Sequence, residues 1–236
     1  AVGLAAHDAP LVTRPPFRAP HHTVSTAGLI GGGPIPHPGE VTLAHNGVLF
    51  LDELPEFRRD ALEALREPLE TGIVSITRVR SHQVYPSRFQ MIAAMNPCPC
   101  GYHGSTFKTC LCPTATIRRY RLKLSGPLLD RIDLHVELPQ VRFGDLTSDR
   151  PEESSHTVRE RIAVARRRQE GRYTGLKIKT NAGLSGRMLR KFCRLDPKAL
   201  AYLEKVAQTF HLSARAHDKT LKIARTIADL AGSDAI

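Results

Sequence analysis

Three short apolar segments in the first part of the chain predict the strands of a parallel sheet. They lie at residues 48–51, 89–95 and 134–138. Apolar segments of this length are typical of strands that are buried on both faces, as in a sheet covered by helices. The pattern therefore predicts an α/β fold for this part of the chain.

The segment after the first predicted strand has the spacing of a helix. Phe57, Ala61 and Leu65 recur every four residues, which places them on one helical face. Pro68 and Gly72 follow and predict the end of this helix.

Two further patterns flank this helix. Residues 73–86 predict a β-hairpin whose tip lies at 78–82, and residues 31–39, rich in glycine and proline, predict a loop. The four residues 40–43 predict a short strand after that loop.

From Ser154 onward the periodicity becomes helical. Residues 157–160 have the form of a capping box, and Asp196 followed by proline predicts another helix start. The predicted core faces consist of Val158, Ile162 and Ala165, then Leu200, Leu203, Ala207 and Phe210, then Leu221, Ala224, Ile227 and Leu230. The sequence thus predicts an α/β domain over residues 1–142 and an all-α domain over residues 151–236.

The charge balance narrows the class of partner. The 236 residues include 34 Lys and Arg against 23 Asp and Glu, a net charge of +11, and 41% of residues are hydrophobic. This composition supports a folded core and excludes a disordered chain. The positive charge favours nucleic acid or nucleotide phosphate as a partner, although a solvated basic surface has the same composition. No apolar run approaches the ~18 residues of a membrane span, so no membrane partner is expected.

Four of the five cysteines lie close together, as two C-x-C pairs: Cys98, Cys100, Cys110 and Cys112. Bunched cysteines in a chain of this size favour a reducing compartment, so we expect a cytoplasmic protein. Four thiolates can complete a tetrahedral site for zinc or another soft metal, and His103 could replace one thiol, although zinc sites more often use C-x₂₋₄-C. Free thiols and a redox pair remain the alternatives. Cys193, which stands alone, is expected to be a small core residue.

Two adjacent carboxylates follow the first predicted strand. Asp52 and Glu53 end the run Val48–Leu51, at the edge where ligands of open α/β sheets bind. One carboxylate there can hold hydrated Mg²⁺, and the other can polarise a water for attack on a phosphate. This is the Walker B layout of an ATPase. Two acids at a helix N-terminus would give the same pattern.

Several ordered blocks resemble the magnesium-chelatase-like AAA+ ATPases, and more closely their ComM and YifB branch. The resemblance spans about residues 15–232 and includes blocks at residues 17–22, 39–53, 93–101, 125–133, 213–216 and 224–230. It implies an AAA+ core, in which a parallel sheet carries helices and hairpin insertions, followed by an all-α lid domain.

The phosphate loop of that family, G-x-x-x-x-G-K-[S/T], does not occur in this sequence. Gly31–Gly33 does not replace it, because no Lys-Ser/Thr pair follows. We therefore expect the chain to be a C-terminal fragment that by itself binds ATP poorly and scarcely hydrolyses it.

The resemblance implies roles for five residues. Asp52 would coordinate Mg²⁺ and Glu53 would be the catalytic base of ATP hydrolysis. Asn96 would be sensor 1, beside the γ-phosphate. Arg131 would be the arginine finger that reaches the nucleotide of a neighbouring subunit. Arg215 would be sensor 2 on the lid.

Each of the last three has a simpler interpretation. Asn96 can be a turn residue before proline, and Arg131 can form a local ion pair with Asp130 or Asp133. Arg215 can belong to the basic surface of the last helix.

The predicted hairpin resembles the pre-sensor-1 insertion of this family, and residues 28–39 resemble its helix-2 insertion. Arg78, Arg80 and His82 lie at or near the hairpin tip, where basic side chains can contact the backbone of a nucleic acid. An ordinary solvated turn is the alternative. The pair His21-His22 has the composition of a ligand pair but lies among prolines, so a loop contact is favoured.

The resemblance implies that the full-length protein is an ATP-driven, homo-hexameric DNA helicase or branch-migration motor of competence and recombination. One alternative is a chelatase-type motor that remodels a protein partner for Mg²⁺ insertion. Another is a zinc-bearing DNA-binding module without motor activity. The basic hairpin favours DNA over a protein partner.

Overall fold

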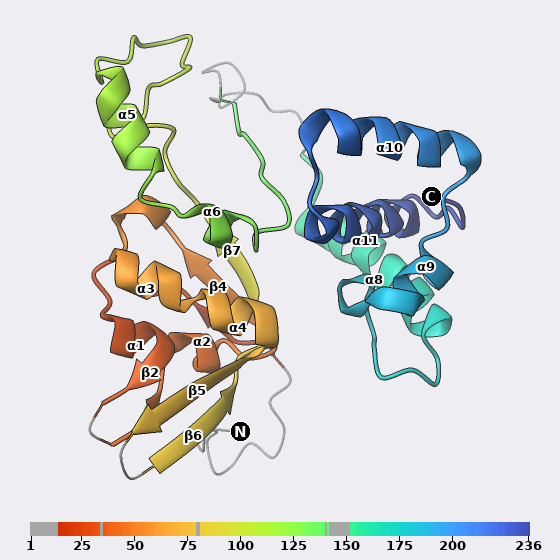
Figure 1. Cartoon of the computed structure of the whole chain (residues 1–236), viewed down its shortest axis with the longest axis horizontal. Helices are drawn as coiled ribbons and strands as arrows, with labels where there is room; N and C mark the ends of the chain where they lie inside the picture. Colours follow the sequence, from red (N-terminus) through yellow and green to blue (C-terminus); the bar gives the residue numbers. More distant parts are fainter. Residues whose placement is uncertain (1–13, 34, 79–80, 140, 142–151) are drawn as a thin grey trace. The chain divides into compact units, whose positions relative to one another are not determined.

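The computed structural model describes residues 14–33, 35–78, 81–139, 141 and 152–236. The chain divides into two units, Ala1–Gln140 and Val141–Ile236, which are described separately (Figure 1). The first unit combines strands and helices, and the second is helical.

The first unit contains a three-stranded parallel sheet of order β1-β4-β7 and two small antiparallel pairs, β2-β3 and β5-β6. Its elements are β1 (Phe17–Arg18), α1 (Thr26–Ile30), β2 (Gly31–Gly32), β3 (His37–Pro38), α2 (Glu40–Leu43), β4 (Val48–Leu51), the 3₁₀ helix η1 (Leu54–Glu56), α3 (Arg59–Ala64), α4 (Arg66–Thr71), β5 (Ile73–Arg78), β6 (Ser81–Pro86), β7 (Gln90–Ala93), α5 (Thr114–Arg121) and α6 (Gly126–Leu129).

The central strand is β4, which pairs in parallel with β1 and with β7. The first two predicted strands are therefore confirmed. Leu49 and Leu51 of β4 are fully buried, whereas three of the four residues of β7 are exposed because β7 is an edge strand. The strands approach closely at Gly47, where a Cβ would lie 1.9 Å from the carbonyl oxygen of Pro16.

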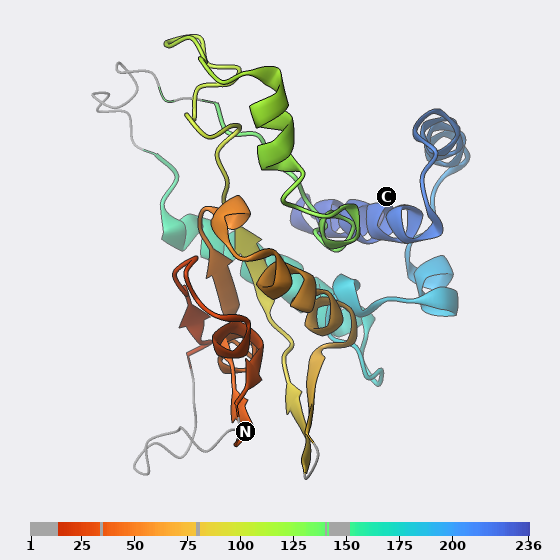
Figure 2. The same ribbon diagram turned by 60° about the vertical axis from the view of Figure 1, so that its left-hand side comes forward.

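The predicted helix after β4 is present as two short helices, α3 and α4, which lie over one face of the sheet (Figures 1 and 2). Phe57, Ala61 and Leu65 are all buried, as their spacing predicts. Gly72 ends α4 with a positive φ of 73°. Pro68 does not end the helix, because it lies in the first turn of α4, where a missing N–H breaks no helical bond.

The strand predicted at residues 40–43 is wrong, since this segment is the short helix α2. Glu40 occupies its first turn and accepts two hydrogen bonds from Arg18, at 2.6 and 2.7 Å. Val41 is fully buried. A β-branched residue in so short an apolar stretch fits either structure, and here the ion pair and the core contact decide.

The strand predicted at residues 134–138 is also wrong. The segment has no regular secondary structure, and Leu134, Val136 and Leu138 are 65%, 74% and 86% exposed. A strand needs a neighbour to pair with its backbone groups. None of the strands that the structure describes pairs with this segment.

The predicted hairpin is confirmed as β5 and β6, with Arg78 opposite Ser81. Its base contacts the segment predicted as a loop, where the hydroxyl of Tyr85 donates to the carbonyl of Pro36 at 3.2 Å. The loop prediction is only partly correct, because β2 and β3 form a short antiparallel pair within this segment. Ile76, 7% exposed, belongs to the core of the unit. Both views place the hairpin and helix α5 at opposite ends of this unit (Figures 1 and 2).

The second unit consists of α8 (Ser155–Arg172), the 3₁₀ helix η2 (Asn181–Gly183), α9 (Gly186–Phe192), α10 (Pro197–Phe210) and α11 (Ala214–Leu230). Asp196 caps α10 as predicted, accepting from the Ala199 N–H at 2.7 Å. Helix α8 begins earlier than the predicted capping box, since Ser154 is its N-cap.

The core of the second unit is partly polar, which the apolar periodicity did not predict. Leu203 and Leu221 are buried as predicted, but Phe210 and Ile227 are 70% and 59% exposed. The buried face of α11 instead includes Arg225 and Asp229. The Asp229 carboxylate, fully buried, accepts hydrogen bonds from Arg172 and Asn181.

Replacing Asp229 with alanine is expected to destabilise the second unit by about 3–5 kcal/mol, since it leaves the buried Arg225 and the partly buried Arg172 without their carboxylate. Both guanidinium groups lie within ion-pair distance of this carboxylate. Urea denaturation at neutral pH measures the loss. The exposed pair of Asp234 with Arg168 provides a control, because Asp234→Ala should cost less than about 1 kcal/mol.

The same carboxylate predicts an acid-sensitive second unit. Burial is the largest influence and disfavours the charged form, but the hydrogen bonds from Arg172 and Asn181 and the charges of Arg172 and Arg225 together outweigh it and lower the pKa of Asp229 below its ordinary value. The resulting stabilisation is present above that ordinary pKa and is lost as the pH falls through the lowered one. Equal acid sensitivity in Asp229→Ala and the parent chain would contradict this assignment.

Candidate functional site

The carboxyl ends of the three parallel strands gather polar side chains from distant parts of the sequence. Asp52 and Glu53 follow β4, and Asn96 follows β7. Leu51 lies opposite Ala93 in the β4-β7 pair, so these residues emerge at the same edge. All three side chains are exposed. The structure thus brings together the residues expected to bind magnesium, to act as base and to sense the γ-phosphate.

The backbone turns sharply between the two carboxylates. Glu53 has a left-handed conformation, with φ 52° and ψ 46°, and its N–H donates to Oδ1 of Asp52 at 2.8 Å. The next residue, Leu54, is buried and donates its N–H to the carbonyl of Ala94. The turn therefore ends the strand and presents both carboxylates to solvent.

His22 is a site residue for which the sequence favoured a loop contact. Its Nδ1 lies 3.1 Å from Oε2 of Glu53, and its ring makes an edge contact with Phe57. The signal was present in the sequence, because His21-His22 follows strand β1. Since β1 is parallel to β4, its carboxyl end lies at the same edge of the sheet.

Helix α5 contacts the turn that carries Asn96. The pKa of the Tyr120 hydroxyl is raised by burial and by the charge of Glu56, while a hydrogen bond from the backbone of Asn96 acts in the opposite direction. Nε of Arg121 donates to the carbonyl of Pro97 at 3.4 Å. The turn that carries Asn96 is thus held by contacts with α5.

Arg131 follows α6 and is only 14% exposed. Its guanidinium donates to the carboxylate of Glu70 on α4 and to the carbonyl of Pro127, the latter at 2.7 Å. Leu128 anchors this segment because it is fully buried in the core. The ion-pair partner is therefore a residue 61 positions away, which sequence proximity did not suggest.

The remaining predicted site residues belong to other elements. Arg215 is an exposed residue in the first turn of α11, in the second unit, so its part in a nucleotide site stays a prediction. His82 is exposed, and its Nδ1 lies 3.0 Å from Oγ1 of Thr77 across the hairpin. Arg78 closes β5, and Arg80 lies outside the described residues.

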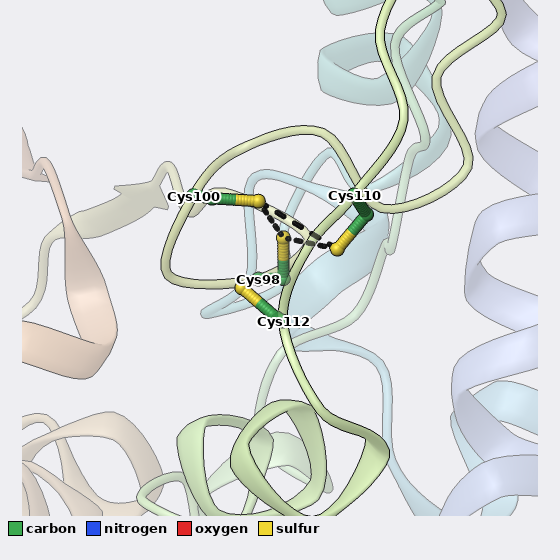
Figure 3. A group of neighbouring side chains, drawn as sticks. All are labelled: Cys98, Cys100, Cys110 and Cys112. Carbon is green, nitrogen blue, oxygen red and sulfur yellow. Dashed lines mark hydrogen bonds between the residues drawn. The ribbon is translucent and has the colours of Figure 1, made fainter.

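The four clustered cysteines point toward one another from two segments of one loop (Figure 3). Their sulfur atoms all lie within 4.8 Å of one another, so the group can hold a metal ion. Backbone hydrogen bonding from Tyr102 lowers the pKa of Cys100 to about 6. At Cys110 a backbone bond from Cys112 favours the thiolate, but desolvation and the other thiols raise the pKa to about 12.

A basic groove of about 830 Å³ runs between η1 and α5. Arg59, Arg118, Arg119 and Lys123 line it, around an apolar floor that includes Phe57. Lys123 is paired with Glu56 at 3.0 Å. Four basic side chains therefore line a groove beside η1, the element that directly follows the two carboxylates.

Both units match models of known protein families. The model described as magnesium chelatase, subunit ChlI, matches residues 1–146, and that described as its C-terminal part matches residues 152–236. The chain belongs to the magnesium chelatase ChlI family. Its parallel sheet with helices, followed by a helical unit, is the AAA+ core and lid of that family.

Within the ChlI family the chain lies in the YifB and ComM branch. It is 49% identical over 222 residues to the uncharacterized protein YifB of Escherichia coli K12, and the matched region covers 94% of this chain and 43% of YifB. It is 47% identical over 223 residues to the competence protein ComM of Haemophilus influenzae, covering 94% of this chain and 42% of ComM. The chain thus spans less than half the length of these relatives.

A more distant similarity extends to a replication protein. The chain is 27% identical over 132 residues to the DNA replication licensing factor mcm6 of Dictyostelium discoideum, covering 56% of this chain and 13% of that protein. In the described part of this ChlI family member, none of the helices is long and apolar enough to cross a bilayer.

Proposed function

We propose that the full-length protein is an ATP-driven AAA+ motor that acts on DNA. The observation that carries the proposal is the meeting of Asp52, Glu53 and Asn96 at one edge of the sheet in a ChlI family member. Carboxylates and an amide at the carboxyl edge of a parallel sheet suit a magnesium nucleotide. ATP with Mg²⁺ is therefore the proposed substrate complex, and this edge is one part of its site.

Asp52 is proposed to hold Mg²⁺ through its hydration shell, since one oxygen already accepts from the Glu53 N–H. Glu53 is proposed to orient the attacking water, and His22 to fix its carboxylate between turnovers. Asn96 would contact the γ-phosphate. Arg215 would contact it from the lid, and Arg131 from a neighbouring subunit of a homo-hexamer.

DNA is proposed as the polymer on which the motor acts. The net charge of +11, the basic hairpin tip and the basic groove beside α5 supply phosphate contacts. The relatives named for competence and for DNA replication agree with this choice. The free cysteines agree with a cytoplasmic site of action.

The test is the ATPase rate of the full-length protein with and without single-stranded and branched DNA. Stimulation by DNA together with strand separation would support the motor. Hydrolysis at a rate that DNA does not change would favour the second candidate, a motor that remodels a protein partner. The description of the family as magnesium chelatase supports this candidate. DNA binding without any hydrolysis would leave a DNA-binding module.

The hairpin tip provides a more specific prediction. The double substitution Arg78→Ala/Arg80→Ala in the full-length protein should lower the salt dependence of DNA binding by about two units of slope, one for each phosphate that an arginine no longer neutralises. Strand separation should fall more than DNA-independent ATP hydrolysis does. Binding titrations over a range of salt concentrations, with unwinding and ATPase assays, measure all three.

A matched control removes the same charge from another surface. Arg58→Ala/Arg66→Ala alters one exposed and one partly buried ion pair on and beside α3 and α4, so it should leave unwinding unchanged. If both double variants bind DNA with the salt slope of the parent protein, the hairpin tip is a solvated turn.

A further inference from the structure

The loop at residues 98–112 has little of the secondary structure and apolar burial that usually stabilise the conformation of a segment. It contains no helix or strand, and Cys98 is its one buried residue. Phe107 and Leu111, its larger apolar side chains, are 63% and 85% exposed. Since apolar burial and backbone ladders supply little stability here, another interaction must fix the loop, and small segments of this kind use a metal or a disulfide.

We propose that Cys98, Cys100, Cys110 and Cys112 bind one Zn²⁺ ion as a closed structural site. Zinc bound by thiolates has Zn–S distances of about 2.3 Å, which sets the edge of a sulfur tetrahedron at about 3.8 Å. The sulfur atoms are separated by 3.4 Å between Cys98 and Cys100, and by 3.6 Å from each of these to Cys110. Three of the four thiols are thus already close to the spacing of the coordinated state, and the sulfur of Cys112 lies within 4.8 Å of theirs.

The same distances argue against a disulfide. A sulfur–sulfur bond is about 2.05 Å long, and all four cysteines are free. A disulfide joins only two cysteines, whereas three thiols lie within 3.6 Å of one another here. A tetrahedral metal uses all four.

The backbone around the first C-x-C pair is shaped to bring the thiolates together. Gly101, with φ +80°, donates its N–H to the carbonyl of Cys98 at 3.0 Å, which closes a turn after Cys100. The N–H of His103 donates to the sulfur of Cys98 at 3.3 Å. Such N–H to sulfur bonds support zinc ligands by stabilising their negative charge.

The charge of the loop and its surroundings suits a tetrathiolate. Four thiolates and one Zn²⁺ carry a net charge of −2. Lys108 lies within the loop, and Arg121 donates to the carbonyl of Pro97, next to Cys98. A basic neighbourhood therefore offsets the charge of the occupied site.

The site is structural because its four protein ligands leave no open position for a substrate or water. It joins two turns of chain: one begins two residues after Asn96, and the other ends two residues before α5 starts. Bound zinc would therefore hold the carboxyl end of β7 against α5, where the backbone of Asn96 meets Tyr120. Zinc acts in this way on the position of Asn96 and not on the chemistry.

The first test is metal content. The chain, purified without a metal-affinity tag and analysed by mass spectrometry of the elements, should carry about one zinc ion. Replacement by Co²⁺ should give the intense visible absorption of a tetrahedral thiolate complex. Tryptic cleavage after Lys108 should become several-fold faster once a chelator removes the metal.

Single substitutions of cysteine distinguish a loss of metal coordination from a loss of folding. Cys112→Ser should lose the zinc, whereas Cys112→His should retain it, because three cysteines and one histidine also form a structural zinc site. Cys193→Ser, in the second unit, is the matched control and should keep the metal. A chain with no zinc and four freely reactive thiols would overturn the proposal, as would iron in place of zinc or a disulfide within the loop.

Discussion

Glu53→Gln in the full-length protein should retain ATP binding and lose most of its turnover, by about 10²- to 10⁴-fold. The amide has the shape of the carboxylate but cannot accept the proton of the attacking water. Glu53 is exposed beyond the end of β4, and its backbone is fixed by the left-handed turn, so the substitution leaves no buried group unpaired. Single-turnover hydrolysis and nucleotide binding, measured side by side, separate chemistry from affinity.

The neighbouring carboxylate is the control. Glu56 lies three residues further on, is similarly exposed, and pairs with Lys123 at the surface. Glu56→Gln should therefore hydrolyse ATP at close to the parent rate. Hydrolysis by Glu53→Gln at that same rate would show that another group activates the water.

Arg131→Ala should abolish hydrolysis, by about 10³- to 10⁵-fold, with nearly unchanged nucleotide affinity. An arginine finger stabilises charge that develops only in the transition state, so its loss lowers turnover more than ground-state binding. To act in a neighbouring subunit, the guanidinium must exchange its contact with Glu70 for the nucleotide. Rings mixed from Arg131→Ala and Glu53→Gln subunits should recover part of the activity, because some interfaces then combine an intact base with an intact finger.

Glu70→Gln distinguishes this role from a structural one, since it removes the ion pair but keeps the arginine. Under the finger assignment it leaves hydrolysis largely intact. If Arg131→Ala and Glu70→Gln instead lose thermal stability and activity in parallel, Arg131 serves the fold through its pair with α4.

The sequence predicted correctly the features that depend on residues close together in the chain or on the ends of the predicted strands. The apolar run of β4 is followed directly by Asp52, and parallel pairing with β7 brings Asn96 to the same edge. The hairpin and the capping of α10 by Asp196 depend on residues a few positions apart, and both are confirmed. The spacing of the cysteines also indicated their meeting.

What the sequence did not predict depends on contacts between distant residues. The pairing of His22 with Glu53 follows from the order of strands in the sheet, and that of Arg131 with Glu70 from the packing of α6 near α4. In the second unit, Asp229 takes a core position that the apolar period assigned to Ile227 and Leu230, because two arginines and an asparagine satisfy its charge. Periodicity counts only apolar residues, so it cannot detect a polar core.

The exposed edge of β7 has a practical consequence for handling the protein. Among the residues that the structure describes, no strand pairs with the outer edge of β7. Unpaired strand edges are templates for pairing with other chains, and Ile92 and Met95 on or beside β7 are both more than 40% exposed. Leu134, Val136 and Leu138 add a second exposed apolar stretch in the same unit. Purified alone, this chain should aggregate through irregular edge-to-edge association as its concentration rises. Light scattering measures the mass of the particles. A mass that keeps growing with concentration would distinguish such aggregates from a closed ring, whose mass is fixed.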